Sequence, residues 1–234
     1  MHCGIKTRFG LHWLRMRLFV GIALPPAASR SLQSAVDHTR SSHAAVSSAL
    51  RWITPDSWHI TLQFLGGVLP DRFACLVGQL AAVRFAPVRV ELGALGCFNR
   101  PGVVFADVPA NPALTALVRR VQAATAQCGC AAEARPFRPH VTLARAMRNR
   151  QARGPGGGNA RPSSRIANLS PDQAFRAIAP RSRAAVPVIG FTAHEFLLYE
   201  SLLGVDGAQY EVRARFALAD SPDNGISEYG KIVP

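Results

Sequence analysis

The sequence His-x-Thr-Leu occurs twice, at residues 59–62 and 140–143, and each copy lies inside an apolar, strand-like run. In a β-strand, residues i and i+2 point to the same face, so the histidine and threonine of each copy share one face. Ile60 and Val141, which lie between them, then point into a core. The chain is thereby constrained to form two half-buried strands with matching polar faces.

The pattern of apolar residues and turn signals around the two motifs indicates the other elements. We expect strands at 18–24, 58–65, 88–98, 103–108, 141–144, 188–201 and 208–218, and helices at about 27–39, 70–83 and 111–128. Strict β-α-β alternation is absent and hairpins are present, which favours an α+β fold over a doubly wound sheet. Each motif ends a strand–helix–strand series, so we predict a bilobal duplicated fold with two antiparallel-rich sheets, outer helices and a central cleft.

Positive charge is concentrated outside the predicted core of the protein. The net charge is +13, and residues 148–185 hold eight arginines against one acidic residue, Asp172. We predict a leader without fixed structure at 1–15, a bilobal domain at 16–219 with a basic disordered insertion at 148–186, and a loose tail at 220–234. The natural start is either Met1 or Met16. A basic segment of this kind can hold phosphate backbones or remain a solvated linker.

The cysteines and the apolar runs bear on the cellular environment. The five cysteines are odd in number and form no C-x-x-C, which favours neither a disulfide framework nor a zinc ribbon. We therefore expect a reduced, cytoplasmic protein. No apolar run reaches the ~18 residues that span a bilayer, so we expect no membrane partner. Basic residues before the apolar run at 18–24 leave a cleaved signal peptide as the alternative.

The paired motifs suggest acid–base chemistry. Histidine titrates near neutral pH, so two imidazoles facing each other can serve as one acid and one base. In-line attack at phosphorus needs both, while threonine hydroxyls and an arginine can hold the phosphoryl oxygens. A lone histidine in an apolar strand is more often structural, but two copies rarely arise by chance. Zinc needs a third ligand, for which only His194 and Glu195 are candidates; with no acidic cluster for Mg²⁺, a metal-free route is favoured.

An arginine and two aromatic residues are further candidates for the site. Arg145 lies five positions after His140, so strict alternation would place it on the opposite face unless the strand bends there. Arg135 and Arg138 could serve instead, and each of the three could equally be a solvated surface charge. Phe64 and Phe137 could stack a base or fill the core.

Several stretches together resemble a known group of enzymes. They are residues 17–25, 51–52, 58–66, 138–145, 196–201 and 207–210. With its two His-x-Thr motifs, the chain resembles the two-histidine phosphoesterase superfamily. The Phe-Leu-Gly after the first motif and the arginine after the second are similar to the RNA 2′,3′-cyclic phosphodiesterases, also called RNA 2′-5′ ligases. The leader and the basic insertion are not part of that family pattern.

The resemblance implies an activity and a set of site residues. It implies metal-free hydrolysis of RNA 2′,3′-cyclic phosphate ends to 2′-phosphomonoester ends, with possible reversal as 2′-5′ ligation, by a monomer without a cofactor. By carry-over, His59 is the proton donor, His140 the proton acceptor, and Thr61, Thr142 and Arg145 bind the phosphate. The residues alone leave open which histidine is the acid. Two alternatives also stay open, a phosphodiesterase acting on another 2′-linked or cyclic nucleotide and a noncatalytic RNA-binding module.

Overall fold

A computed structural model of the chain describes the predicted domain with several gaps. The described residues are 15–42, 47, 50–98, 102–109, 111–131, 133, 135–146, 189–204 and 207–219. Almost all of the predicted leader, the basic insertion and the tail lie outside them. Among the described helices, none combines the length and the apolar character that a membrane crossing requires.

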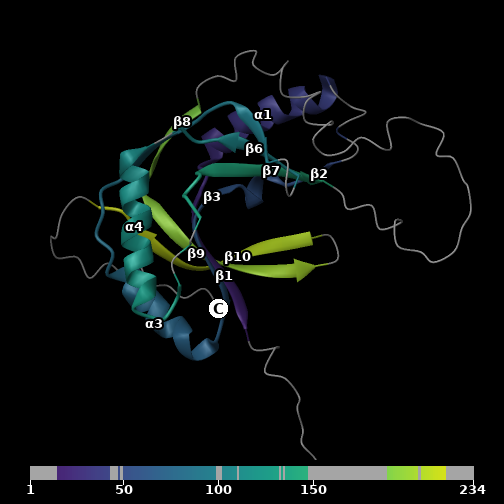
Figure 1. The fold of residues 1–234 in the computed structure, drawn as a ribbon. Coiled ribbons are helices and arrows are strands. Elements are labelled where there is room, and N and C mark those ends of the chain that lie inside the picture. Colours follow the sequence, from purple (N-terminus) through teal and green to yellow (C-terminus); the bar gives the residue numbers. More distant parts are fainter. Residues whose placement is uncertain are drawn as a thin grey trace, which may run out of the picture.

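Helices and strands alternate irregularly along the chain, as an α+β fold requires (Figure 1). The strands are β1 (Met16–Ala23), β2 (Leu50–Trp52), β3 (His59–Val68), β4 (Val88–Leu92), β5 (Leu95–Phe98), β6 (Val103–Asp107), β7 (His140–Ala146), β8 (Ile189–Ala193), β9 (Glu195–Gly204) and β10 (Gly207–Ala217). The helices are α1 (Pro26–Ser42), η2 (Pro55–Ser57), α3 (Pro70–Ala81) and α4 (Pro112–Ala126). The Asn111 side chain caps α4 by accepting from the Leu114 backbone N–H at 3.1 Å, as its sequence predicts.

The main sheet has eight strands in the order β10-β9-β1-β3-β7-β6-β5, with β2 beside β7. Every pairing described within it is antiparallel. A separate two-stranded sheet pairs β4 with β8. These observations confirm the α+β class and the antiparallel pairing. The central cleft remains a prediction.

Two strand–helix–strand series form the centre of the molecule, and we call them the first half (β1, α1, β3) and the second half (β6, α4, β7). The two halves share the main sheet. One hydrophobic cluster joins Leu32 of α1, Leu76 of α3 and Leu117 of α4 to the sheet residues Ile60 and Val141. The long helices therefore cover the face opposite the two histidines, and α3 and α4 lie side by side along it (Figure 1).

Two predicted strands are each divided in the structure, because the chain changes sheet within them. The run expected at 88–98 is β4 and β5, separated at Gly93, whose N–H donates to the Asp107 carbonyl at 2.7 Å. The run expected at 188–201 is β8 and β9, separated at His194. The first parts, β4 and β8, pair with each other. Apolar periodicity could not show these divisions because both parts of each run are apolar.

The structure corrects the expectation that no disulfide forms. Cys75 on α3 and Cys128 in the turn after α4 are joined, although they are 53 positions apart. The packing of α3 against α4 brings them together, and the sequence spacing alone gives no sign of this. Cys130 is a free thiol, and Cys3 lies outside the described residues. The cytoplasmic location stays a prediction.

Candidate active site

The two motifs meet at a single pair of residues in the centre of the main sheet. Ile60 of β3 lies opposite Val141 of β7, and this is the one pair described between the two strands. In an antiparallel pair, the flanking residues point to the other face, so His59 lies toward Thr142 and Thr61 toward His140. A local twofold axis between Ile60 and Val141 therefore relates the two motifs, as the predicted duplication requires.

The two strands also bulge at equivalent places. Leu62 is skipped where Val20 and Gly21 of β1 pair with Gln63 and Thr61 of β3. On β7, Leu143 is skipped in the same way between β6 pairs to Thr142 and Ala144. Each motif threonine is therefore followed by two buried residues in succession, and the same order of burial occurs in both strands. A β-bulge of this kind re-aims the residues that follow it.

The bulge explains how Arg145 reaches the site in spite of the alternation rule. After Leu143 and Ala144 both point inward, Arg145 returns to the face of His140 and Thr142. Its charge lowers the pKa of both His59 and His140, which places it near the two imidazoles. The twofold-related position on β3 is Phe64, which also lies five residues after its histidine and is 56% exposed. Phe137 instead packs against the core.

Backbone hydrogen bonds orient the two histidines in the same way. His59 Nδ1 is 2.8 Å from the Ser57 carbonyl, and His140 Nδ1 is 2.7 Å from the Arg138 carbonyl. A carbonyl oxygen only accepts, so each Nδ1 carries a proton and donates it. Each Nε2 is then the nitrogen that can take up or release a proton, which is the arrangement that acid–base work requires.

His59 lies in an aromatic environment that the sequence analysis did not predict. The rings of Phe19, Tyr210 and Tyr199 lie 4.7, 5.0 and 5.6 Å from its imidazole, measured between ring centroids. Burial lowers the pKa of His59 to about 4, with the charges of His140 and Arg145 acting in the same direction and the hydrogen bond to Ser57 opposing them. Burial also raises the pKa of Tyr199 to about 12, so its hydroxyl stays neutral.

His140 has a more polar environment. The rings of Phe98 and Phe105 lie 5.0 and 5.5 Å from it, and the Arg138 guanidinium lies over the Phe98 ring at 4.9 Å. Burial lowers the pKa of His140, and the charges of Arg138 and Arg145 lower it further. The hydrogen bond to the Arg138 carbonyl and the carboxylate of Asp107 oppose this effect. The two imidazoles are therefore matched in geometry but not in electrostatics.

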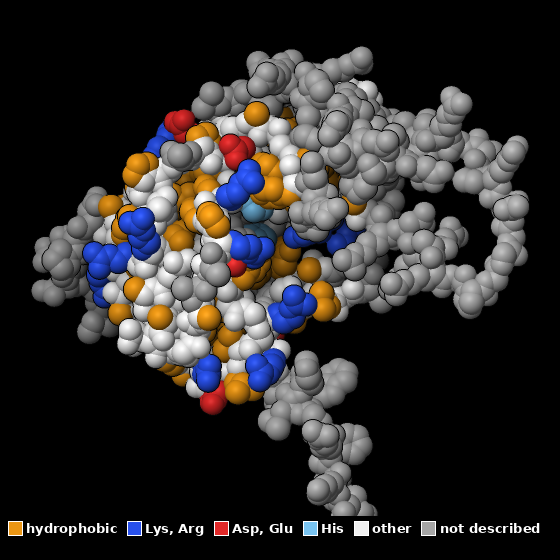
Figure 2. Space-filling view, in the orientation of Figure 1, with side chains coloured by type: hydrophobic (Ala, Val, Ile, Leu, Met, Phe, Trp, Pro, Cys, Tyr) orange, Lys and Arg blue, Asp and Glu red, His pale blue; other side chains and the backbone are white. Residues whose placement is uncertain are grey.

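The site is basic, because Arg138 and Arg145 lie near the two histidines. Figure 2 shows histidine side chains at the surface, set between hydrophobic and basic side chains. Arg135 pairs with Glu133 at 2.9 Å and is exposed, whereas Arg138 lies beside His140. Within the described part of the chain, no three His, Cys, Asp or Glu side chains cluster as metal ligands would. His194 is exposed at the junction of β8 and β9.

Comparisons with known proteins agree with this arrangement. The model of the 2′-5′ RNA ligase superfamily matches residues 25–204. The chain is 30% identical over 182 residues to the RNA 2′,3′-cyclic phosphodiesterase of Geobacillus stearothermophilus, which covers 76% of this chain and 50% of the relative. This chain therefore spans half the length of that relative. It is also 30% identical over 130 residues to the Escherichia coli RNA 2′,3′-cyclic phosphodiesterase, covering 55% of this chain and 71% of the relative.

The fold is similar to that of solved structures. The crystal structure of Escherichia coli LigT in its apo form superposes with a TM-score of 0.62 at 25% identity. The match covers 88% of this chain and 99% of LigT. A structure described as a phosphoesterase has the same TM-score at 23% identity, which supports the fold alone.

Proposed function

Because the chain belongs to the 2′-5′ RNA ligase superfamily, we propose that it hydrolyses the 2′,3′-cyclic phosphate ends of RNA to 2′-phosphomonoester ends. The related proteins named RNA 2′,3′-cyclic phosphodiesterases support this choice of substrate. The observation that carries the proposal is the pair of His-x-Thr motifs related by a local twofold axis at Ile60 and Val141. This pair supplies two imidazoles and two hydroxyls on one face of the sheet.

The reaction places one histidine on each side of the phosphorus. His140 Nε2 takes a proton from water as the water oxygen attacks phosphorus, and the bond from phosphorus to the 3′ oxygen breaks. His59 Nε2 gives a proton to the departing 3′ oxygen, which becomes a hydroxyl. The phosphate stays on the 2′ oxygen. A metal-free route of this kind needs only the two imidazoles and donors for the charged oxygens.

The electrostatics of His59 limit how it can act as the donor. With a pKa of about 4, His59 is neutral near pH 7 in the absence of substrate. A bound phosphodiester anion acts in the opposite direction, because a nearby negative charge favours the protonated imidazole. We propose that substrate binding raises the pKa of His59 and so loads it with the proton that it gives to the 3′ oxygen.

The remaining site residues hold the substrate. We propose that the hydroxyls of Thr61 and Thr142 and the guanidinium of Arg145 bind the phosphate oxygens and stabilise the charge that grows on them. The exposed ring of Phe64, on the same face, is placed to stack a nucleobase. In 2′-5′ ligation the same groups act with a 5′ hydroxyl in place of water. The 5′ oxygen gives its proton to His140 Nε2 and attacks the phosphorus of the cyclic phosphate, the bond to the 3′ oxygen breaks, and a 2′-5′ link forms.

The test is turnover of an oligoribonucleotide that ends in a 2′,3′-cyclic phosphate, measured in excess EDTA. His59→Ala and His140→Ala are each expected to lower kcat by at least about 100-fold, since general acid–base catalysis contributes about 10²–10⁴-fold. His194→Ala, at an exposed histidine outside the motifs, is the matched control and should keep full activity. Full turnover by either motif variant would contradict the proposal.

Two further readouts separate the alternatives. Loss of wild-type activity in EDTA would contradict the metal-free route. A panel that includes 2′-5′-linked oligonucleotides and other cyclic nucleotides decides the substrate, because the two motifs alone would serve each of these phosphodiesters. RNA binding without turnover of any of them would indicate a noncatalytic module.

A further inference from the structure

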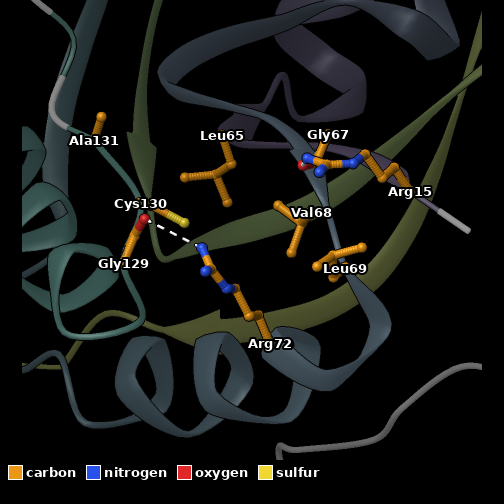
Figure 3. A pocket seen from close by; sticks show the side chains of 9 residues that line it. All are labelled: Arg15, Leu65, Gly67, Val68, Leu69, Arg72, Gly129, Cys130 and Ala131. Carbon is orange, nitrogen blue, oxygen red and sulfur yellow. Dashed lines mark hydrogen bonds between the residues drawn. The ribbon is translucent and has the colours of Figure 1, made fainter. Parts of the chain in front are cut away.

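A second concavity lies at the far end of β3, outside the site described above. It has a volume of about 190 Å³. Figure 3 shows its apolar residues Leu65 and Val68 between the side chains of Arg15 and Arg72. Arg15 directly precedes β1 and Arg72 lies in the first turn of α3, so two separate segments bring positive charge to one pocket.

No carboxylate of the described residues neutralises the positive charge of this pocket. Arg15 donates to the Gly67 carbonyl at 3.2 Å, and Arg72 donates to the Gly129 carbonyl at 3.4 Å. A guanidinium has five N–H donors, so each side chain is held in place while most of its donors stay available. Among the residues placed by the structure, neither arginine has a carboxylate within 4 Å, and no lining residue is acidic.

The other titratable side chain of the pocket adds no negative charge. Cys130 is a free thiol, and its burial raises its pKa, with the charge of Arg72 opposing this effect. The thiol therefore stays neutral near pH 7. Arginines with carboxylate partners, such as Arg135 with Glu133 and Arg215 with Glu195, lie elsewhere on the protein. The pocket is thus a small cavity with two guanidinium groups that pair with no carboxylate in the part of the chain that the structure describes.

The size and donors of the pocket indicate the kind of ligand. Guanidinium groups bind phosphate through paired hydrogen bonds, and two of them match one phosphodiester. Pockets for whole small molecules measure about 300–1,000 Å³, so this smaller cavity suits a single phosphate with part of its sugar. Leu65 and Val68 form an apolar wall against which the C–H groups of a sugar can pack.

The position of the pocket relates it to the proposed RNA substrate. β3 runs from His59 through Phe64 to Val68, and at about 3.3 Å per residue Gly67 lies at most ~26 Å from His59. Surfaces that bind single strands contact roughly 4–16 nucleotides. We propose that Arg15 and Arg72 bind a backbone phosphate of the RNA strand several nucleotides to the 5′ side of the reacting end. This inference rests on the proposed function.

The experiment compares substrates of increasing length. The series runs from adenosine 2′,3′-cyclic monophosphate to oligoribonucleotides of two to ten nucleotides with the same cyclic end. For the wild-type protein, kcat/KM should rise with length and level off once the strand reaches the pocket. The double variant Arg15→Gln with Arg72→Gln should lower kcat/KM for the long substrates about tenfold. It should leave turnover of the mononucleotide unaltered. Arg119→Gln with Arg120→Gln, at two exposed arginines on α4 outside the pocket, is the control with the same change of charge.

The salt dependence gives a second readout that fold damage would not imitate. Each arginine that contacts a phosphate of a single strand should contribute roughly 0.7 to the slope of log affinity against log salt. The double variant of the pocket should lose about twice that amount for long substrates, whereas Arg119→Gln with Arg120→Gln should keep the wild-type slope. If a glutamine variant fails to fold, Arg15→Lys with Arg72→Lys takes its place. Lysine keeps the charge but lacks the planar set of paired N–H donors of arginine, so this variant must still weaken the rise of kcat/KM with substrate length.

The outcomes of the two proposals are distinguishable. If the wild-type protein hydrolyses no cyclic phosphate, the proposed function fails. If it hydrolyses every length with equal kcat/KM, or if the double variant keeps the full length effect, the phosphate subsite is overturned while the proposed function stands. Calorimetric titration with inorganic phosphate separates the sources. Binding that the double variant loses, without any length effect, would show a site for free phosphate and overturn the RNA subsite.

Discussion

Strands β3 and β7 have the same backbone course but different side chains beyond their motifs. Both carry His-x-Thr, both bulge after the threonine, and both fix Nδ1 through a carbonyl two residues earlier. At the re-aimed position β3 has Phe64 and β7 has Arg145. The backbone symmetry supplies matched positions for the two histidines, while the side chains beyond them differ. In the proposed function, Phe64 stacks a nucleobase and Arg145 binds the phosphate.

The two histidines also differ in their surroundings. His59 lies among three aromatic rings, whereas His140 has Asp107 and Arg138 nearby. A symmetric pair with equal pKa values could not keep one imidazole neutral and the other protonated over a wide pH range. Burial holds the pKa of His59 at about 4, so the protein without substrate favours a neutral His59, and in the proposed reaction the bound phosphodiester anion has to load it with the proton that it donates.

Of the two residues at the re-aimed positions, Arg145 and Phe64, removal of the charged one should have the larger effect. Arg145→Ala is expected to lower kcat/KM by about 100-fold, because it removes a charged donor from the phosphate in the transition state. Steady-state kinetics on a cyclic-phosphate oligonucleotide measure this. Arg135→Ala, which removes an exposed arginine paired with Glu133, is the control and should change little. A loss of less than twofold for Arg145→Ala would show that the bulge does not bring this side chain to the substrate.

A smaller effect, on KM rather than on kcat, is expected for the aromatic residue, Phe64. Phe64→Ala should raise KM about tenfold and leave kcat nearly unchanged, because stacking of one base contributes about 1–3 kcal/mol to binding. Phe64→Tyr keeps the ring and should behave like the wild-type protein. If Phe64→Ala instead lowered kcat as Arg145→Ala does, the two positions would share one role and the comparison between the strands would fail.

The smallest effect concerns the pH dependence of the two imidazoles. Both pKa values are lowered, so kcat/KM should peak between about 4 and 6.5, where the pair shares one proton. The fall of kcat/KM on the alkaline side follows the deprotonation of His140, whose pKa is raised by the carboxylate of Asp107. Asp107→Asn removes that carboxylate, lowers the pKa of His140 and should move this fall to lower pH by roughly a few tenths of a unit. A shift to higher pH would contradict the assigned surroundings.

Local patterns in the sequence predict the parts of the fold and site that depend on alternation. His59 and Thr61, and their counterparts on β7, share a face because strand geometry leaves no other choice. Arg145 could not be placed, because a bulge at Leu143 is a property of pairing with β6 and has no local signature. The disulfide of Cys75 and Cys128 was missed for a similar reason, since it depends on how α3 packs against α4. The aromatic rings around His59 come from β1, β9 and β10, which only the sheet order brings together.

The pair of Ile60 and Val141 also fixes the distance between the two histidines. Both side chains are fully buried beneath the sheet, and on the opposite face their neighbours are His59 and His140. A change in the volume of either aliphatic side chain would be transmitted as a change in the gap between the two imidazoles. Two apolar residues that are fully buried therefore determine the spacing of the groups that we propose to react.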